Sequence, residues 1–465
     1  MKLSRIKVPN TFFIIFSLIV LVAILTWIIP GSEYARVEVE GKQLVDPDTF
    51  RYVESNPQGI GAILMAPIKG FVEAALIIGF VLIVGGAFGV FQKTKAIDSA
   101  IMGLAKAQQS SRLVEVLTIP LFMLLFSIGG AVFGMSEETI PFVLIFVPLA
   151  LTLGYDSITG VAIPFIGAGA GFAGAFLNPF TVGIAQGIAD VSLFSGLQYR
   201  LLAWVIITGI AIMFVMRYAA KVKRNPTSSV MYEKDEKKRK NLDTEEIDEF
   251  EGLSQRHKYV LWTFALGMGV LIFGVLRYHW YIEEIAAVFL ATGIAVGVVG
   301  KLSLDELTNA FEDGAKALVG TAIIIGLARG ILVVARDGHI IDTMLHSLSS
   351  IVANFHPIVS SQMMFIVQTF LNFFVPSGSG QAALTMPIMA PLSDLVGVTR
   401  QTAVLAFQFG DGFSNLIIPT SAVTMGVLML ADIPWEKWAK WILPLELLFL
   451  IAGLILLVPP YFMGW

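Results

Sequence analysis

The sequence predicts an all-α polytopic membrane protein that contains an inverted repeat, with two re-entrant hairpins and two broken helices. The first supporting observation is composition. Of the 465 residues, 56% are hydrophobic and 14% are charged, whereas soluble domains have about 25% charged residues. The second is internal similarity, because Ser136–Gly183 and Ser379–Gly426 align without a gap and share 11 of 48 positions. Most shared residues are Gly, Pro, Ser or Thr, which interrupt apolar helices or supply small polar groups.

The first membrane-spanning helix is expected at 11–30, an uncharged apolar run of 20 residues, which is the length needed to cross a bilayer. A basic N-terminus precedes this run. We interpret the run as a retained anchor, because it is long for a signal peptide and no clear cleavage site follows it. Eight further spans are expected at 70–91, 157–190, 197–218, 259–277, 281–300, 317–335, 399–430 and 438–458.

The distribution of Lys and Arg orients the chain. The polar segment 31–59 contains three of these residues, whereas 217–258 contains eleven. Because loops rich in Lys and Arg stay in the cytoplasm, we expect the N-terminus and the central segment inside and 31–59 outside. The charged residues 220–257 are interpreted as a solvated, disordered cytoplasmic linker. This linker separates a first half, 1–219, from a second half, 258–465.

Two regions, 113–155 and 357–397, each contain two apolar arms that are short for spanning helices and are joined by a polar tip. If each region is a re-entrant hairpin, five spans separate the repeated stretches, which then face opposite sides of the membrane. This parity predicts nine spans and two hairpins, with 113–155 opening from the cytoplasm, 357–397 from outside, and the C-terminus outside. The preceding segments 93–109 and 337–354 mix apolar and polar residues and are expected to be interfacial helices.

Gly, Pro and polar residues interrupt the spans 157–190 and 399–430 near their centres. Unwinding of a helix exposes backbone carbonyls to a cation and helix N-termini to an anion. Broken apolar segments at matching places in two halves are typical of secondary transporters, whose substrates bind where the repeats meet. The breaks supply the candidate binding residues Asn178, Thr181, Asp411, Ser414, Asn415 and Thr420, and a candidate sodium site near Gly167, Gly169, Gly410 and Gly412.

The hairpin tips supply the other candidate residues. An ionisable residue at membrane depth is costly and is therefore a candidate for function. Three further ionisable residues, Glu73, Arg329 and Glu446, lie within predicted spans, and we interpret them as members of ion pairs between helices. The tip residues expected to bind a substrate or a coupling ion are Ser136, Glu137, Glu138, Thr139, Ser377, Ser379 and Gln381.

The motifs GGAVFGMSEET, FVPSGSGQAALTMPIMAPLSDLVGVTRQ and FQFGDGFSNLIIPTS resemble those of YfcC/DcuC-type carriers of the ion transporter superfamily. The resemblance covers nearly the whole chain and implies an elevator-type secondary transporter of the bacterial cytoplasmic (inner) membrane. It also implies that hairpin tips and broken helices form the substrate and ion sites, and that scaffold helices form a homodimer. Sodium-coupled dicarboxylate members carry Ser-Asn-Thr at both tips, whereas this chain has Ser-Glu-Glu-Thr and Ser-Gly-Ser-Gly-Gln.

Carriers of this kind are described as C4-dicarboxylate carriers or as basic amino acid antiporters, and the charge of the expected site separates the two. Glu137, Glu138 and Asp411 are acidic, and the nearest expected cation is Arg400 at the edge of the site. Three carboxylates would repel a dianion in a site of low dielectric constant. We therefore expect an amino acid substrate, preferably basic, moved by exchange or with Na+ or H+. A C4-dicarboxylate coupled to Na+ or H+ is the alternative.

Other functional classes have less support in the sequence. An ion or solute channel that uses the tips as a filter is the alternative from another class. The chain has no cysteine, and it shows no metal-binding spacing, nucleophile–base pair or P-loop, so an enzyme or an ATP-driven pump is not expected. The expected partners are a small-molecule substrate, the lipid bilayer and a second copy of the chain, without a cofactor or nucleic acid.

Overall fold

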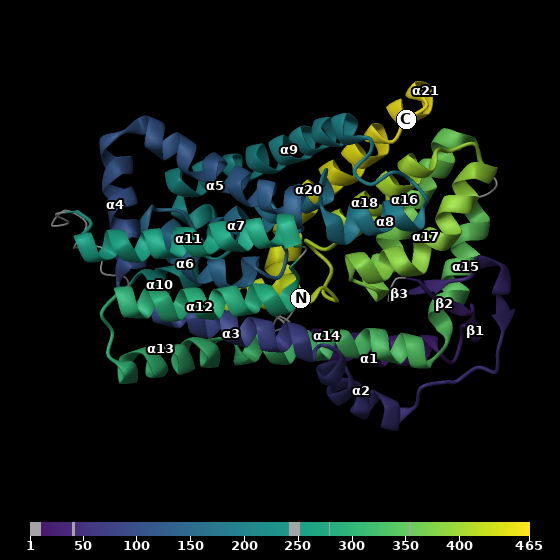
Figure 1. Ribbon diagram of the computed structural model, residues 1–465, viewed down its shortest axis with the longest axis horizontal. Coiled ribbons are helices and arrows are strands. Elements are labelled where there is room, and N and C mark those ends of the chain that lie inside the picture. Colours follow the sequence, from purple (N-terminus) through teal and green to yellow (C-terminus); the bar gives the residue numbers. More distant parts are fainter. Residues whose placement is uncertain (1–10, 40–41, 241–251, 279, 353–354) are drawn as a thin grey trace, which may run out of the picture.

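The computed structural model describes residues 11–39, 42–240, 252–278, 280–352 and 355–465. Nearly all regular elements in these ranges are helices, and most lie along the long axis of the molecule (Figure 1). Four short strands form two antiparallel pairs at one end of this axis. The strands are β1 (Ser32–Glu33), β2 (Arg36–Val39), β3 (Lys42–Val45) and β4 (Arg51–Tyr52).

The helices divide at the central charged segment. Those before it are α1 (Thr11–Leu25), α2 (Ile60–Glu73), α3 (Ala75–Lys93), α4 (Ala96–Ser110), α5 (Arg112–Phe133), α6 (Thr139–Thr152), α7 (Ser157–Ala173), the π-helix η2 (Pro179–Gly183), α8 (Ile184–Ile188) and α9 (Leu197–Arg224). Those within and after it are α10 (Tyr232–Arg239), α11 (Gln255–Tyr278), α12 (Ile282–Val299), α13 (Leu304–Ala317), α14 (Val319–Asp337), α15 (Ile340–Val352), α16 (Pro357–Phe374), α17 (Gly378–Leu395), α18 (Arg400–Ser414), α19 (Ala422–Leu430), α20 (Trp435–Leu456) and α21 (Pro459–Met463). Two 3-10 turns, η1 (Pro47–Thr49) and η3 (Pro226–Ser228), complete the description.

Eight helical segments among the described residues are long and apolar enough to cross a membrane. They differ in part from the nine predicted spans. The prediction that all hairpin arms are short was wrong for α5, α16 and α17, which have 22, 18 and 18 residues. Of α1, 15 residues are described, because residues 1–10 before it lie outside the described ranges. The predicted spans at 70–91 and 317–335 correspond mainly to α3 and α14. Each of these helices directly follows another helix, α2 or α13, that the sequence did not indicate.

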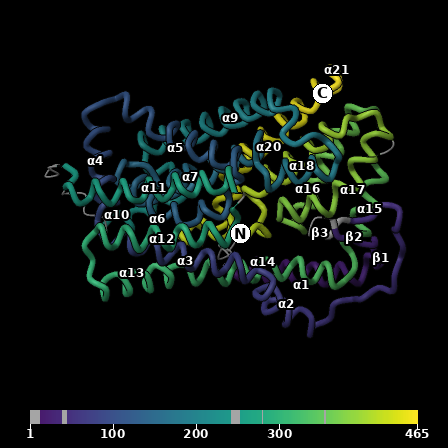
Figure 2. Tube along the Cα trace, viewed as in Figure 1, coloured from purple at the N-terminus to yellow at the C-terminus, as the bar shows by residue number. Residues whose placement is uncertain are grey.

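The two predicted hairpins are both present as helix–tip–helix pairs. In Figures 1 and 2, α5 and α6 extend from the end of the molecule that holds α4 toward its middle. The pair α16 and α17 extends toward the middle from the opposite end, beside α15 and the strands. The two tips, residues 134–138 and 375–377, therefore approach each other in the interior. The helices α4 and α15 occupy the positions predicted for interfacial helices, although residues 353–354 of that prediction lie outside the described residues.

Close glycine contacts hold two long, interrupted helices together. One residue separates α2 from α3, and one residue separates α13 from α14. In this assembly α2 packs on α14, and α3 packs on α13. A Cβ atom on Gly70 of α2 would lie 2.2 Å from the carbonyl oxygen of Gly326, and one on Gly314 of α13 would lie 2.3 Å from that of Gly85. The backbones can approach this closely only because these residues lack a side chain.

Both predicted broken helices are interrupted in the structure. The first stops at the end of α7 and resumes at η2 and α8, and the second is unwound between α18 and α19. Unwound backbone inside a membrane protein needs partners from the protein itself. The indole nitrogens of Trp438 and Trp435 donate to the carbonyl oxygens of Leu416 (2.9 Å) and Ile417 (2.8 Å). At the end of α7, before the first break, the Gln408 side chain donates to the carbonyl oxygen of Phe172 at 2.6 Å.

The prediction of a disordered central linker does not hold for its first part. Residues 225–239 form η3 and α10, which pack on the rest of the protein, and Asp235 of α10 is buried. The acidic part of the predicted linker, 243–251, lies outside the described residues.

The strands are attached to α15 through a buried carboxylate. Arg36 donates to both oxygens of Asp342, at 2.9 and 3.0 Å, and the backbone nitrogen of Tyr34 donates to Asp342 Oδ2 at 3.0 Å. Burial, with a further contribution from the Asp342 charge, raises the pKa of Tyr34 to about 12. Because the folded pKa exceeds the ordinary value of 10.0, Tyr34 stabilises this attachment below pH 10, and its contribution falls as the pH rises toward 12.

We predict that Gly70→Ala destabilises the protein by about 1–3 kcal/mol, because the added methyl group would be forced against the backbone of α14. Gly79→Ala is the matched control, because a Cβ at Gly79 of α3 has no atom within 4 Å. Thermal unfolding of the purified variants in detergent measures both. Equal unfolding temperatures for the two variants would contradict the close packing of α2 on α14.

Candidate functional site

A cavity of about 150 Å³ lies where the two hairpin tips meet the two broken helices. Its remaining wall comes from the start of α12, from one face of α14, and from Ala74 and Ile77 at the junction of α2 and α3. The cavity therefore touches segments from both halves of the chain. Eight of the thirteen predicted site residues line it: Ser136, Glu137, Glu138, Thr181, Ser377, Ser379, Asn415 and Thr420.

The first tip presents two glutamates to this cavity. Glu138 is 8% exposed, and its Oε2 accepts a hydrogen bond from the backbone nitrogen of Ser136 at 2.9 Å. Glu137 lies beside Glu138 in the cavity wall. Thr139 lies behind the tip, where its hydroxyl donates to the Ser136 carbonyl oxygen at 2.6 Å. Thr139 therefore shapes the tip, while the two carboxylates give the cavity a negative wall.

The first break is organised by Asn178, which lies outside the cavity. Its Oδ1 accepts a hydrogen bond from the Phe180 backbone nitrogen at 2.9 Å, so it caps the helix that follows. A Cβ on Gly134 would lie 2.7 Å from the same oxygen, which shows how closely the first tip packs on this amide. Asn178 therefore positions the tip against the break. Thr181 lines the cavity, and its hydroxyl is buried without a hydrogen-bond partner.

Asp411 lies beneath the second tip and does not line the cavity. Its side chain is fully buried, and its Oδ1 accepts a hydrogen bond from Asn415 Nδ2 at 3.3 Å. Its Oδ2 has no hydrogen-bond partner and faces the start of α17, where a Cβ on Gly378 would lie 3.1 Å from it. A helix N-terminus favours a negative charge. Asp411 Oδ2 therefore faces the start of α17, outside the lining of the cavity.

Asn372, which sequence reasoning did not select, connects α16 to the second break. Its Nδ2 donates to the Asp411 carbonyl oxygen (3.0 Å), to Ser414 Oγ (2.8 Å) and to Asn415 Oδ1 (3.0 Å). The side chain is completely buried. Asn372 is the last polar residue of α16 before the tip, and an amide at this position in an apolar stretch was the signal that could have identified it. Ser414 is thus part of this network and does not line the cavity.

Gln381 also lies away from the cavity, inside the second hairpin. Its Nε2 donates to Gln368 Oε1 at 2.7 Å and to the Gln368 carbonyl oxygen at 2.9 Å. Gln368 Nε2 in turn donates to Thr385 Oγ1 at 2.9 Å. This buried chain joins α16 to α17, so Gln381 fixes the geometry of the hairpin.

The four glycines of the candidate sodium site divide into two groups. Gly169 and Gly412 line a second, smaller cavity of about 30 Å³ between α7, the first tip and the second break. Gly167 and Gly410 instead pack against α5 and α16, where a Cβ would lie within 3 Å of neighbouring atoms. In the ranges that the structure describes, no three His, Cys, Asp or Glu residues form a metal-binding group.

Arg329 of α14 gives the cavity a cation that the sequence analysis assigned only to ion pairing. Its Nε lies 3.5 Å from Glu73 Oε2, as that prediction requires, but the residue also lines the cavity. Arg336 competes for the same carboxylate, since it pairs with the other oxygen of Glu73. Arg400, the cation expected at the edge of the site, pairs with Asp394 at 2.8 Å and does not line the cavity.

Two further residues depart from the predictions. Tyr281, at the start of α12, lines the cavity and stacks obliquely on Phe180 of the first break, with ring centroids 4.8 Å apart. Glu446 of α20 was expected to pair with a cation, but it makes no ion pair among the described residues, and its Oε1 is buried without a hydrogen-bond partner.

The chain matches the family described as "C4-dicarboxylate anaerobic carrier" (DcuC) over residues 8–461. "Putative basic amino acid antiporter YfcC" of Escherichia coli K12 is 37% identical over 99% of this chain and 98% of its own length. An uncharacterized protein of Haemophilus influenzae is 32% identical over 98% of this chain and 97% of its own.

Two solved transporter structures are also similar to this chain. The YdaH transporter of Alcanivorax borkumensis has 16% identity and a TM-score of 0.47, with 98% of this chain and 99% of that chain covered. MtrF of Neisseria gonorrhoeae has 18% identity and a TM-score of 0.45, with 97% and 95% covered.

We predict that Asn372→Ala destabilises the protein by roughly 1–3 kcal/mol, because three buried acceptors lose their shared donor. Thr369→Ala on the same helix is the control, since the Thr369 hydroxyl bonds only to the Phe365 carbonyl oxygen of its own helix. Thermal unfolding in detergent compares the two variants. If Asn372→Ala unfolds no earlier than the control, the network does not hold the second break.

Proposed function

The chain belongs to the C4-dicarboxylate anaerobic carrier (DcuC) family of membrane transporters, and on this basis we propose that it is a secondary active transporter of amino acids that prefers basic ones. The observation that carries the proposal is the charge of the cavity. Glu137 and Glu138 line one side, and Arg329 lines another. An amino acid offers an ammonium group to the glutamates and a carboxylate to the arginine. Two acidic groups against one basic group favour a substrate with an additional positive charge.

The arrangement of Arg329 supports a role in carboxylate binding. Glu73 is shared between two arginines, and Arg336 contacts it more closely than Arg329 does. Arg329 Nε is buried without a hydrogen bond, so the guanidinium is incompletely satisfied within the protein. Arginine binds carboxylates through a planar fork of donors. The α-carboxylate of a substrate would complete the hydrogen bonding of this group.

A C4-dicarboxylate is the second candidate substrate, and the family description favours it. Arg329 would bind one of its carboxylates. The second carboxylate would lie in a cavity walled by Glu137 and Glu138, where like charges repel strongly at low dielectric constant. Such a substrate would need a coupled Na+ or H+ to offset this repulsion. The basic amino acid is therefore the proposal that needs fewer additional charges.

For the mechanism, we favour an elevator-type carrier built on an inverted repeat. This view is supported by the two hairpins, which approach the cavity from opposite ends of the molecule (Figure 1). In such carriers the substrate site lies between the repeats, and one part of the protein moves past a fixed scaffold. The pairs α2–α3 and α13–α14, held together by glycine contacts, are suited to be that scaffold. With the Lys- and Arg-rich segment in the cytoplasm, the N-terminus lies inside and the C-terminus outside.

We predict that proteoliposomes loaded with unlabelled arginine accumulate external radiolabelled arginine by exchange, whereas succinate on the inside does not drive this uptake. Glu138→Gln should lower the exchange rate at least about tenfold, because it removes one charge that binds the cation while it keeps an acceptor for the Ser136 backbone. Glu283→Gln is the control, since Glu283 is exposed in the first turn of α12 and does not line the cavity.

Two results would refute this assignment. Exchange of succinate without exchange of arginine would support the dicarboxylate candidate instead. Uptake that never exceeds equilibrium, even with an opposing gradient of a second solute, would indicate a channel.

A second prediction concerns Arg329. Agmatine is arginine without its carboxylate, so the wild-type protein should bind arginine about 10- to 100-fold more tightly than agmatine, because agmatine leaves the guanidinium unpaired. In Arg329→Gln this preference should fall to within a few-fold. Competition of each compound against labelled arginine measures the ratio. An unchanged preference in the variant would exclude Arg329 as the carboxylate-binding group.

A further inference from the structure

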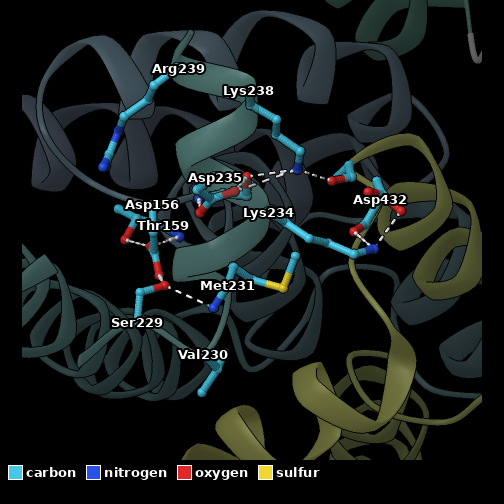
Figure 3. A network of polar contacts seen from close by, with 12 residues as sticks. Asp156, Thr159, Ser229, Val230, Met231, Lys234, Asp235, Lys238, Arg239 and Asp432 are labelled. Atoms are coloured by element: carbon cyan, nitrogen blue, oxygen red, sulfur yellow. Dashed lines mark hydrogen bonds and ion pairs between the residues drawn. The ribbon is translucent and has the colours of Figure 1, made fainter. Parts of the chain in front are cut away.

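We propose that α10, a helix of the central charged segment, clamps the ends of the two broken helices together so that both breaks move as one body. The clamp is formed by Lys234, Asp235 and Lys238, shown in Figure 3. These are positioning residues, because they lie outside the cavity and act on it through α7 and α19. The inference concerns the moving part of the transporter proposed above, and in this sense it rests on that function.

The first contact of the clamp is with the start of α7. Asp235 is 1% exposed, and its Oδ2 accepts a hydrogen bond from the Ser157 backbone nitrogen at 2.8 Å. Its Oδ1 accepts a second hydrogen bond from the Ser157 hydroxyl. The first backbone nitrogens of a helix have no partner within the helix and carry a partial positive charge. A carboxylate from another helix therefore stabilises this end of α7.

The second contact is with the end of α19. Lys238 Nζ donates to the Ala431 carbonyl oxygen at 2.7 Å, and Lys234 Nζ donates to Asp432 Oδ1 at 2.7 Å and to its carbonyl oxygen at 3.1 Å. Ala431 directly follows the last residue of α19. The last carbonyls of a helix carry a partial negative charge, so two ammonium groups stabilise this end.

The two contacts are joined within α10 itself. Lys238 Nζ also donates to the Ser157 hydroxyl at 3.0 Å and lies 3.6 Å from Asp235 Oδ1. Burial lowers the pKa of Lys238, and the neighbouring Asp235 charge opposes this shift. Positions 234, 235 and 238 share one face of a helix, whereas Glu236 and Lys237 are exposed. One short helix thus binds a helix N-terminus with its acid and a helix C-terminus with its bases.

The clamp is coupled to the cavity through the two helices that it binds. α7 leads to the first break, where Thr181 lines the cavity, and α19 follows the second break, where Thr420 lines it. If the ends of α7 and α19 could separate, the distance between these two walls would change. By fixing the start of α7 to the end of α19, α10 keeps these two cavity walls at a constant distance while the two broken helices move together.

The test uses the absence of cysteine from the chain. Lys234→Cys combined with Asp432→Cys places two thiols at the ion pair, and a short bis-methanethiosulfonate reagent can join them through two disulfide bonds that a reducing agent cleaves. Arginine exchange is then measured in proteoliposomes before joining, after joining and after reduction. The proposal predicts that joining changes the exchange rate of this double-cysteine variant by less than about twofold, because α10 and α19 never separate during transport. Loss of exchange on joining, restored by reduction, would show that they must separate and would overturn the proposal.

A second measurement does not depend on the substrate. Hydrogen–deuterium exchange of the intact protein should be at least about tenfold faster at the start of α7 and the end of α19 in Asp235→Asn and Lys238→Met, because these ends lose their caps. Glu236→Gln and Lys237→Met are the matched controls on the exposed face of α10. Unchanged exchange at both helix ends in the first two variants would overturn the clamp.

These two measurements separate the clamp from the proposed function. If the wild-type protein exchanges neither arginine nor lysine, the proposed function fails, and the deuterium measurement still decides whether α10 caps both helices. If arginine exchange is present in the wild type and lost only on joining, the proposed function stands and the clamp is refuted.

Discussion

Unwound backbone in the interior of a membrane protein must find hydrogen-bond partners in the protein, because lipid supplies none. This constraint explains much of the polar chemistry of the structure. Indole nitrogens of α20 satisfy carbonyl groups of the second break, and Gln408 satisfies one at the end of α7. Asn178 caps the helix after the first break, and Asn372 supplies three hydrogen bonds at the second. The breaks are therefore held in defined positions, and a cavity with fixed polar walls becomes possible between them.

The two halves of the chain contribute different charged and polar groups to that cavity. The first tip contributes two glutamates, whereas the second contributes small hydroxyls and the N-terminus of α17. The cation comes from α14 of the packed pair α2–α14, through Arg329. If α14 belongs to the fixed scaffold of an elevator, the group that binds the carboxylate of a substrate lies on the fixed part, and the groups that bind its ammonium lie on the moving part. Binding would then depend on how the two parts are aligned.

The sequence was sufficient for the hairpins, the breaks and eight of the cavity residues, because Gly, Pro and polar residues in apolar runs are strong local signals. It was insufficient where partners decide the role of a residue. Asp411 and Gln381 were predicted to bind a ligand, but neither lines the cavity, and Gln381 is bonded to Gln368 within the second hairpin. Arg329 appeared to be a structural ion pair, and only the packing of α14 brings it to the cavity. The charge run around α10 suggested disorder, since its buried partners lie far away in sequence.

The central claim is that a basic amino acid binds in the cavity between the tips and the breaks. An experimental structure of the purified protein in lipid nanodiscs, determined with and without saturating arginine, tests it most directly. The account predicts new density in this cavity, with the ammonium groups toward Glu137 and Glu138 and the carboxylate toward Arg329. Arginine density elsewhere in the protein, with this cavity unchanged between the two maps, would contradict it.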